Sequence, residues 1–284
     1  MEELGKVSLT EFTLFGQVIS VNLTTFVMTW VVMGLFLLLA WMATRKLSFI
    51  PGRIQNIFEL IFDFLKDITV STLGQKDGMK YYPFILTLFL FILLSNWIGI
   101  IPNIFKILGT FIAVIHSFFG DTVQITMQGL TGIVATVPET IWYSALINAP
   151  GIEEPTKSIN TDLALAIMVF LAVQAYGIKN KGVVKYIRNF VDDPFPMKGP
   201  LIIFFFINPF FYLNLIGMVA NVVSHSFRLF GNIFGGGMII VIVSSLLNYF
   251  LVPVGLFAFF GLFAGLVQAF VFAMLAVTYI QQQQ

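Results

Sequence analysis

The sequence contains no cysteine, which excludes disulfide bonds, thiolate catalysis and thiolate metal sites. Charge is also scarce, since Asp, Glu, Lys and Arg make up 10% of the 284 residues, against about a quarter in an average soluble domain. The formal net charge of +1 provides no basic excess that would attract nucleic acid. A glycine-rich phosphate loop with its Lys and Ser or Thr is missing too, so we expect this chain alone neither to bind nor to hydrolyse nucleotide.

Apolar residues take the place of these groups. The chain is 58% hydrophobic, contains 33 Phe and has a mean hydropathy of +0.94. This composition predicts an all-α integral membrane protein, a single membrane domain over 1–284 with about five membrane helices and one amphipathic surface helix. The first apolar run starts only after Thr24 and lacks the charged n-region and cleavage site of a secretory signal, so we expect that segment to be retained.

The apolar runs give the predicted order of elements. Spans are expected at 25–44, 81–101, 160–178, 201–247 and 254–280, because about 20 apolar residues cross a bilayer. Residues 51–73 alternate polar and apolar side chains at helical spacing, which is typical of an amphipathic helix on the membrane surface. Residues 104–159 hold only short, interrupted apolar parts, so we expect an irregular external or re-entrant section there.

Three isolated polar residues in these segments are expected to have structural roles. Ser95 and Asn96 lie inside the second span, where hydrogen bonds to neighbouring helices are the simplest explanation for them. His116 is a lone histidine on an apolar stretch, and we expect a satisfied structural role for it.

The distribution of basic residues predicts the topology. Six basic residues lie between Arg45 and Lys80 and five between Lys179 and Lys198, whereas the section from Asn103 to Ile159 has two basic and four acidic ones. The positive-inside rule places both basic sections in the cytoplasm. The N-terminus is then outside and the C-terminus cytoplasmic.

One full charge stands out in the last third of the chain. After Lys198 there is no Lys, Asp or Glu, and the only arginine is Arg228. A guanidinium stays charged at any ordinary pH, and placing it near the membrane centre costs roughly 2.5 to 3.5 kcal/mol on insertion scales. Arg228 is therefore a candidate functional residue.

The segment around Arg228 is expected to be one long tilted helix, bent or broken near its start. Some 45 helical residues would extend nearly 70 Å, about twice a bilayer, yet the middle of 201–247 has no good polar turn. Residues three, four and seven apart share one face of a helix. That spacing predicts a polar stripe facing a partner or a water-filled cavity, made of Asn214, Asn221, Ser224, His225, Arg228 and Asn232.

The last predicted helix carries one strongly polar interior side chain, Gln268, with Tyr279 three turns further along the same face. Gln268 could hold the guanidinium but cannot neutralise it. Neither of the last two helices has a carboxylate, so the counter-charge must be Asp162, Glu139 or a carboxylate of another protein. Asp162 lies near a predicted membrane end, where it could instead cap its helix, so an intermolecular and transient counter-ion is favoured.

Several of these stretches together resemble subunit a of bacterial F-type ATP synthases, the membrane stator that faces a rotating ring of c subunits. The stretches are SHSFRLFGN, LVQAFVFAMLAVTYI, FLFILLSNWIGIIPN and NTDLALA. The resemblance covers most of the chain from Thr25 onward and is weakest over 104–159. Its Arg-Leu-Phe-Gly-Asn and Gln-Ala-Phe segments are together highly specific.

The resemblance implies a role in the bacterial inner membrane, with the c ring, the b subunits of the peripheral stalk and the rest of the complex as partners. It implies that Arg228 releases ions from c-ring carboxylates between two offset half-channels. The subunit itself would not be catalytic and would hold no stably bound cofactor or metal, only the translocated Na⁺ or H⁺. The expected ion path is lined by Asn214, Asn221, Ser224, His225, Asn232, Gln268 and Tyr279.

Two positions bear on the choice of ion. Proton-driven relatives commonly have Glu or His nine residues after the arginine and seven before the glutamine, where this chain has Gly237 and Gly261. A proton relay benefits from titratable side chains, whereas Na⁺ needs a wet, roomy path with oxygen ligands. The sequence therefore favours Na⁺ over H⁺.

Two other functions remain open at this point. A stand-alone transporter with an anionic substrate predicts an internal repeat, which the sequence does not display, and activity without partners. An assembly subunit without a role in transport predicts that Arg228→Ala keeps ion flux.

Overall fold

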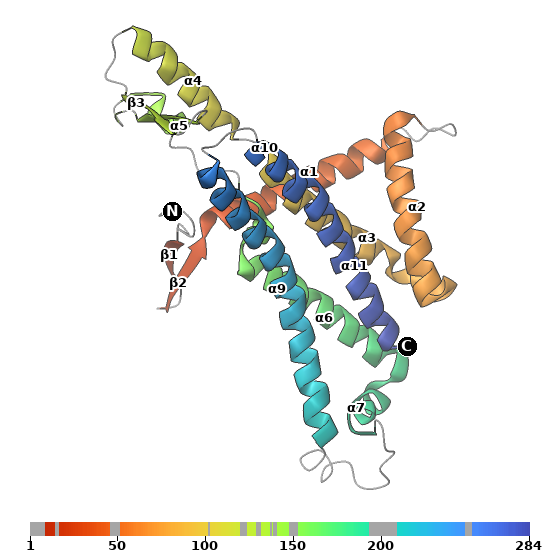
Figure 1. Cartoon of the computed structure of the whole chain (residues 1–284). Helices are drawn as coiled ribbons and strands as arrows, with labels where there is room; N and C mark the ends of the chain where they lie inside the picture. The colour runs from red at the N-terminus through yellow and green to blue at the C-terminus, as the bar shows by residue number, and fades with distance from the viewer. Residues whose placement is uncertain are drawn as a thin grey trace. The chain divides into compact units, whose positions relative to one another are not determined.

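The structure is a computed structural model that describes residues 9–14, 17–45, 52–101, 103–119, 124–128, 132–136, 138, 141–147, 153–192, 209–247 and 252–284 (Figure 1). Over these ranges, five helical segments are long and apolar enough to cross a membrane: Leu23–Thr44, Gln75–Phe118, Ile159–Lys181, Phe211–Leu246 and Gly255–Gln282. The predicted all-α membrane fold is confirmed. Two short antiparallel hairpins accompany the helices.

The chain divides into two compact units, which we describe one at a time. Unit 1 comprises Met1–Leu38, Phe91–Ser158 and Asn232–Val267. Unit 2 comprises Leu39–Leu90, Ile159–Gly231 and Gln268–Gln284. Helices α1, α3, α9 and α11 contribute residues to both.

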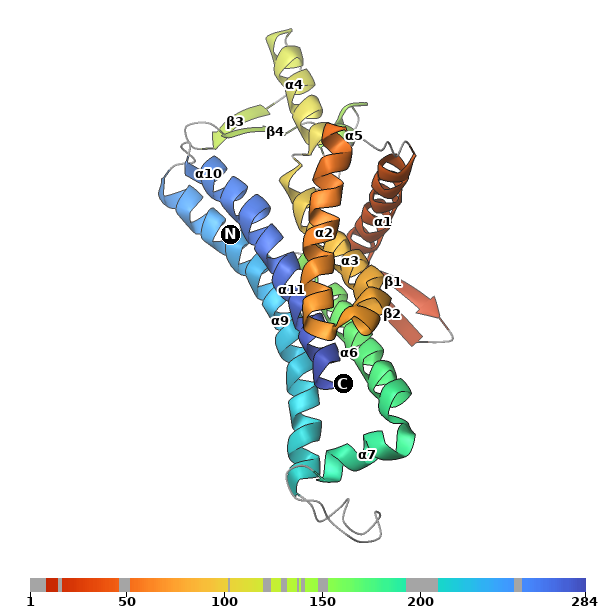
Figure 2. The same cartoon turned by 90° about the vertical axis from the view of Figure 1, so that its right-hand side faces the viewer.

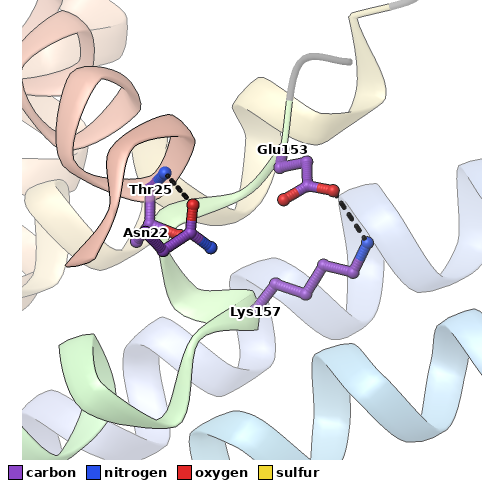
Figure 3. A network of polar contacts seen from close by, with 4 residues as sticks. All are labelled: Asn22, Thr25, Glu153 and Lys157. Carbon is purple, nitrogen blue, oxygen red and sulfur yellow. Dashed lines mark hydrogen bonds and ion pairs between the residues drawn. The ribbon is translucent and has the colours of Figure 1, made fainter. Parts of the chain in front are cut away.

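Unit 1 begins with a hairpin and the start of the first membrane helix. Strands β1 (Leu9–Leu14) and β2 (Gln17–Asn22) pair antiparallel, with Leu9 opposite Asn22. Helix α1 (Leu23–Thr44) follows at once, and the side chain of Asn22 accepts a hydrogen bond from the Thr25 amide at 3.2 Å (Figure 3). This capping contact fixes where α1 begins, because the first turn of a helix has free amide donors.

The section predicted to be irregular contains several short elements of unit 1. They are α4 (Ile104–Phe118), β3 (Gln124–Gln128), β4 (Gly132–Thr136), α5 (Ser144–Ile147) and the 3₁₀ turn η2 (Pro155–Lys157). The His116 ring packs against Tyr143, with ring centroids 5.1 Å apart. Next to η2, Glu153 pairs with Lys157 at 3.6 Å (Figure 3). Burial against Gly99 raises the pKa of the neighbouring Glu154 carboxyl above its ordinary value.

Helix α3 (Gln75–Trp97) ends in unit 1, just before the 3₁₀ turn η1 (Ile98–Ile100), and tests the prediction for Ser95 and Asn96. Asn96 is buried, donates to the Gly265 carbonyl at 3.0 Å and accepts from Thr156 at 2.7 Å. The prediction of structural hydrogen bonds is confirmed for Asn96. It is wrong for Ser95, whose buried hydroxyl has no hydrogen-bond partner in the described part of the chain.

The last predicted helix is a composite element. Helix α10 (Val252–Ala258) continues through a π-helical stretch, η3 (Phe259–Ala264), into α11 (Gly265–Gln282). Trp97 donates from its indole nitrogen to the Leu262 carbonyl at 3.2 Å, within unit 1. The hydrophobic pattern did not predict the π stretch, because one wide turn leaves the run of apolar side chains unchanged.

In unit 2, helix α2 (Arg53–Leu73) occupies the range predicted for the surface helix. Ile57, Leu60 and Phe64 are exposed along one side, while Leu65 is fully buried on the other. The helix is held by two long-range hydrogen bonds. Tyr82 donates to the Phe62 carbonyl at 3.0 Å, and Gln284 at the end of α11 donates to the Leu73 carbonyl at 2.9 Å.

The remaining part of unit 2 positions the candidate site. Helix α6 (Ile159–Lys181) ends at Gly182, whose φ of +76° lets the chain turn sharply into α7 (Val183–Asp192) (Figures 1 and 2). Helix α9 (Pro209–Leu246) runs unbroken for 38 residues. Residues 201–208, the first part of the predicted long helix, lie outside the described residues.

Candidate functional site

Arg228 lies on an open face of α9. Its side chain is exposed, although the next residue, Leu229, is fully buried. Ser224 and Asn221, one and two turns earlier, are also exposed. Within its unit, Arg228 forms no hydrogen bond or ion pair with any described residue. The single charge of the last third of the chain is therefore available to a group outside this unit.

His225, three residues before Arg228, is packed against another helix. It is 2% exposed, and its ring meets Phe272 of α11 edge-on, with centroids 3.7 Å apart. Tyr279, two turns further along α11, lies 5.7 Å from the same ring. The members of the predicted polar stripe are thus buried to different extents: Asn221, Ser224 and Arg228 are exposed, and His225 packs against α11.

A small cavity of about 60 Å³ opens between α6, α9 and the end of α11 in unit 2. A water molecule needs roughly 10 to 15 Å³ of such volume, so a few waters fit. Apolar residues of α6 form much of the wall, including Ala166 and Val173. The polar groups that line it are Gln174, Asn221, His225, Tyr279, Gln282 and Gln283.

Gln174 connects this cavity to α7. Its amide group donates to the sulfur of Met218 on α9 at 3.2 Å and accepts a short hydrogen bond from the Tyr186 hydroxyl. Burial raises the pKa of the Tyr186 phenol above its ordinary value of 10.0, so the hydroxyl keeps its proton. A methyl group at Gly177 would come within 2.7 Å of the Tyr186 ring, which shows how closely α7 folds against α6.

Gln268 is buried on α11, where its exposed fraction is 7%. Its amide nitrogen has no hydrogen-bond partner among the described residues, and no hydrogen bond joins it to Arg228. That Gln268 lies beside the guanidinium and holds it therefore stays a prediction. Both residues belong to unit 2.

Of the two proposed internal counter-ions, only Asp162 lies in the described part of the chain, and it does not pair with Arg228. Asp162 is fully buried, and its two carboxylate oxygens have no partner among the described residues. The capping alternative is wrong as well, because Asp162 is the fourth residue of α6 and accepts no backbone hydrogen bond. Glu139 lies outside the described residues.

The outer members of the stripe have other surroundings. Asn214 is half-buried on α9, and Asn232 in unit 1 donates to the Ala264 carbonyl at 3.4 Å. Across the described ranges, no three His, Asp or Glu side chains gather as ligands of a metal ion would.

The two glycines used to predict the ion have different surroundings in unit 1. A Cβ atom at Gly237 would have nothing within 4 Å. A Cβ atom at Gly261 would lie 2.5 Å from a side-chain carbon of Ile100. Close packing is therefore a sufficient reason for glycine at 261, and only Gly237 leaves the open space that a wet path needs.

Sequence reasoning missed Ser226 and Gln174. Ser226 is 1% exposed, and its hydroxyl has no hydrogen-bond partner in the described chain. It is two residues from Ser224 and from Arg228, so the spacing that defines the stripe excludes it. Gln174 stands alone in an apolar span, and a search for polar residues along α6 would have found it.

Comparison with known proteins shows the family of the chain. The family model of the ATP synthase A chain matches residues 26–281. ATP synthase subunit a of Geotalea daltonii is 32% identical over 253 residues, which cover 89% of this chain and 84% of the relative. The corresponding subunit of Moorella thermoacetica is 32% identical over 257 residues (90% and 88%), and that of Desulforamulus reducens is 28% identical over 282 (96% and 84%).

A match of this extent includes the whole of α6, nearly all of α11 and the arginine-bearing helix α9. The chain belongs to the family of ATP synthase subunit a, the multi-pass membrane subunit of the rotary F-type complex.

Proposed function

We propose that Arg228 is the group that releases ions from the c-ring carboxylates as they pass α9. The observation that carries this proposal is an exposed guanidinium on a long, largely apolar helix, unpaired among the described residues of its unit. In lipid such a charge is costly, and a carboxylate arriving on a moving partner provides the missing anion. As the ring carboxylate meets Arg228, its ion is displaced into one half-channel.

The same charge would keep the two half-channels apart. A cation on one side of Arg228 is repelled by the guanidinium, so it cannot pass directly to the other side without riding on the ring. The energy collected is about 2.3 kcal/mol for each charge that crosses 100 mV. The subunit makes and breaks no covalent bond in this scheme and is not catalytic by itself.

The cavity between α6, α9 and α11 is the part of the structure best suited to an aqueous path. It contains polar groups on all three helices, and it ends near Gln282 and Gln283 at the C-terminus. With the basic sections inside, as the positive-inside rule requires, this end faces the cytoplasm and the N-terminus lies outside. We therefore assign the cavity to the cytoplasmic half-channel.

Sodium is the ion we propose, although the support is narrower than the sequence suggested. Gly237 leaves open space, and Asn214, Asn221 and Ser224 carry oxygen atoms that suit a hard cation. Gly261 no longer counts toward this choice. ATP hydrolysis by the whole complex in vesicles should depend on Na⁺, and its independence of Na⁺ at every pH would assign the path to protons.

A cross-linking experiment tests the placement of α9. The chain has no cysteine, so Phe227→Cys gives a single reactive thiol beside Arg228. We expect it to form disulfides with cysteines introduced around the c-ring carboxylate. Ala273→Cys, on the buried face of α11, is the matched control and should not cross-link. An intact complex in which Phe227→Cys also fails to cross-link would contradict the proposal.

A further inference from the structure

Five buried polar residues of unit 2 have side-chain atoms without a hydrogen-bond partner among the described residues. One is the Tyr176 hydroxyl, near the end of α6. The atoms of the other four are both carboxylate oxygens of Asp162, both ring nitrogens of His225, the Ser226 hydroxyl and the Gln268 amide nitrogen. None of these side chains is more than 7% exposed. Buried polar groups are nearly always hydrogen-bonded, so such a group in a native structure indicates a water or an ion that occupies the site.

The contacts of unit 2 place these other four residues at a similar depth. Gln174 of α6 contacts Met218 of α9, and Ala166, two turns earlier on α6, lines the cavity with His225, two turns later on α9. Helices α6 and α9 therefore run antiparallel. Asp162 is one turn before Ala166, a rise of about 6 Å, which brings it to the level of the turn that follows His225. That turn contains Arg228 and Leu229. The sequence had placed Asp162 nearer the membrane end.

The third helix adds Gln268 at the same level. Phe272 of α11 contacts His225, and α11 also runs antiparallel to α9, since Tyr279 and Gln283 line the cavity with residues before and around His225. Gln268 is one turn before Phe272, so it too lies near the level of Leu229. Figure 2 shows α6, α9 and α11 approaching one another in this part of unit 2.

Asp162 faces the other helices and not the surroundings of the protein. It shares one side of α6 with Ala166, Val169 and Val173, all of which are buried, at spacings of four, seven and eleven residues. Arg228 has its side chain on the exposed side of α9 and does not pair with it. The carboxylate therefore has no cation among the described residues of its own unit.

An ionised carboxylate is not stable in such a place by itself. Taking it out of water without a counter-charge is so unfavourable that it binds a proton or another cation instead. Polar side chains at the same level of the neighbouring helices can serve either one. Ser226 offers a hydroxyl oxygen and Gln268 offers an amide, and water can complete a coordination shell.

We propose that Asp162 is a stationary binding site for a small monovalent cation, Na⁺ or H⁺, inside subunit a. It holds one cation at the level of Arg228 but on the inner side of the three helices. The inference rests on the proposed function, because the cation bound at Asp162 exchanges with the path that feeds the c-ring carboxylates. Asp162 then keeps a cation close to the point of transfer.

Chemical labelling of the whole complex in membranes tests for this site directly. A hydrophobic carbodiimide forms an adduct with a protonated carboxyl group, and mass spectrometry of subunit a locates it. In Na⁺-free buffer at neutral pH we expect an adduct at Asp162, while exposed Asp67 on α2 stays unmodified. Protection of Asp162 by added Na⁺ identifies a sodium site. Labelling that ignores Na⁺ and declines as the pH rises identifies a proton site.

A neutral variant gives the functional measurement. Asp162→Asn keeps the shape of the side chain and removes its charge, and Asp67→Asn is the matched control. ATP-driven cation uptake is measured in vesicles against Na⁺ concentration and against pH. We expect the half-saturating cation concentration to rise about tenfold or more in Asp162→Asn, the size of effect typical of a lost supporting group at a cation site. Asp67→Asn should match the unmodified complex.

The outcomes separate this proposal from the proposed function. If Asp162→Asn shows unchanged cation dependence while Arg228→Ala stops uptake, the stationary site is wrong and the role of Arg228 stands. If Arg228→Ala keeps coupled uptake, the proposed function itself fails. If Asp162→Asn prevents assembly, the carbodiimide labelling of the unmodified complex tests the site instead. If Asp162 then forms no adduct at neutral pH, even in Na⁺-free buffer, the proposed cation site is wrong.

Discussion

Helices α9 and α11 are both long and apolar, yet they are used in different ways. In the apolar stretch of α9 only 17% of the residues are buried, against 39% in the stretch that contains α11. The buried positions of α11 include small residues without exposed surface, Ala269, Ala273 and Ala276. The open side of α9 has large side chains such as Ile216, Val219 and Phe227.

The difference supports the proposal that α9 is completed by another protein. Within a membrane, lipid is as apolar as leucine, so helices associate through close packing and polar contacts and not through hydrophobicity. Small residues give α11 a packed interface inside this chain. An open face made only of apolar side chains would suit lipid, but α9 adds Arg228, which lipid does not tolerate. We infer that the open face of α9 is completed by the c ring.

The largest effect is expected from removing the charge on the open face. Arg228→Ala should lower ATP-driven ion uptake about 100-fold or more, because a fixed charge aimed at the reacting group commonly contributes a factor of 10² to 10³. Arg228→Lys keeps the charge without the planar fork and should retain part of the uptake. Both are measured in vesicles that contain the whole complex.

Thermal unfolding of these variants provides the control. Arg228 is exposed and makes no hydrogen bond or ion pair with the described residues of its unit, so neither substitution should change the melting temperature of the subunit. Full uptake in Arg228→Ala would support a subunit needed only for assembly. A large loss of thermal stability would show that the arginine belongs to the fold, and the contrast between the two helices would fail.

The same substitution, Phe to Ala, can be made at an exposed position of α9 and at a buried position of α11. Phe272 on α11 is 1% exposed and packs against His225, whereas Phe227 on α9 is 54% exposed. Phe272→Ala should destabilise the subunit by about 1 to 2 kcal/mol, less than the 3 to 5 kcal/mol of soluble cores, because lipid also solvates an apolar ring. Phe227→Ala should leave stability unchanged. Melting temperatures in detergent check both, and equal values would refute the assignment of faces.

Much of this architecture could be predicted from the sequence because lipid imposes simple rules. An apolar run of sufficient length and a single arginine are visible without a structure, and they indicated the membrane fold and Arg228. The sequence could not tell on which side of α9 each polar residue lies relative to its neighbours. His225 and Arg228 are three residues apart and share a face by spacing, yet one is buried against Phe272 and the other is exposed.

What escaped prediction depends on contacts between distant segments. The depth of Asp162 follows from the register of α6 against α9, which no local pattern encodes. The packing of Gly261 against Ile100 explains a glycine that looked like a lost titratable group. Ser95 was expected to find a partner as Asn96 does, but its shorter side chain remains without one in the described chain.

The smallest effect is expected from two glycines of α9, one in open space as on α9 and one closely packed as on α11. A methyl group at Gly231, one turn from Arg228, would have no atom within 4 Å in this chain, whereas one at Gly236 would lie 3.0 Å from the Phe260 ring. Gly231→Ala should therefore raise helix stability by about 0.5 to 1 kcal/mol, the usual gain over glycine. Gly236→Ala should lose that gain, because Phe260 must shift. Melting of the isolated subunit measures these changes. In the assembled complex we expect the opposite order for ion uptake, with Gly231→Ala more harmful than Gly236→Ala, because only Gly231 lies on the face that the c ring is proposed to approach. Uptake that is more sensitive to Gly236→Ala would place the ring on the other side of α9.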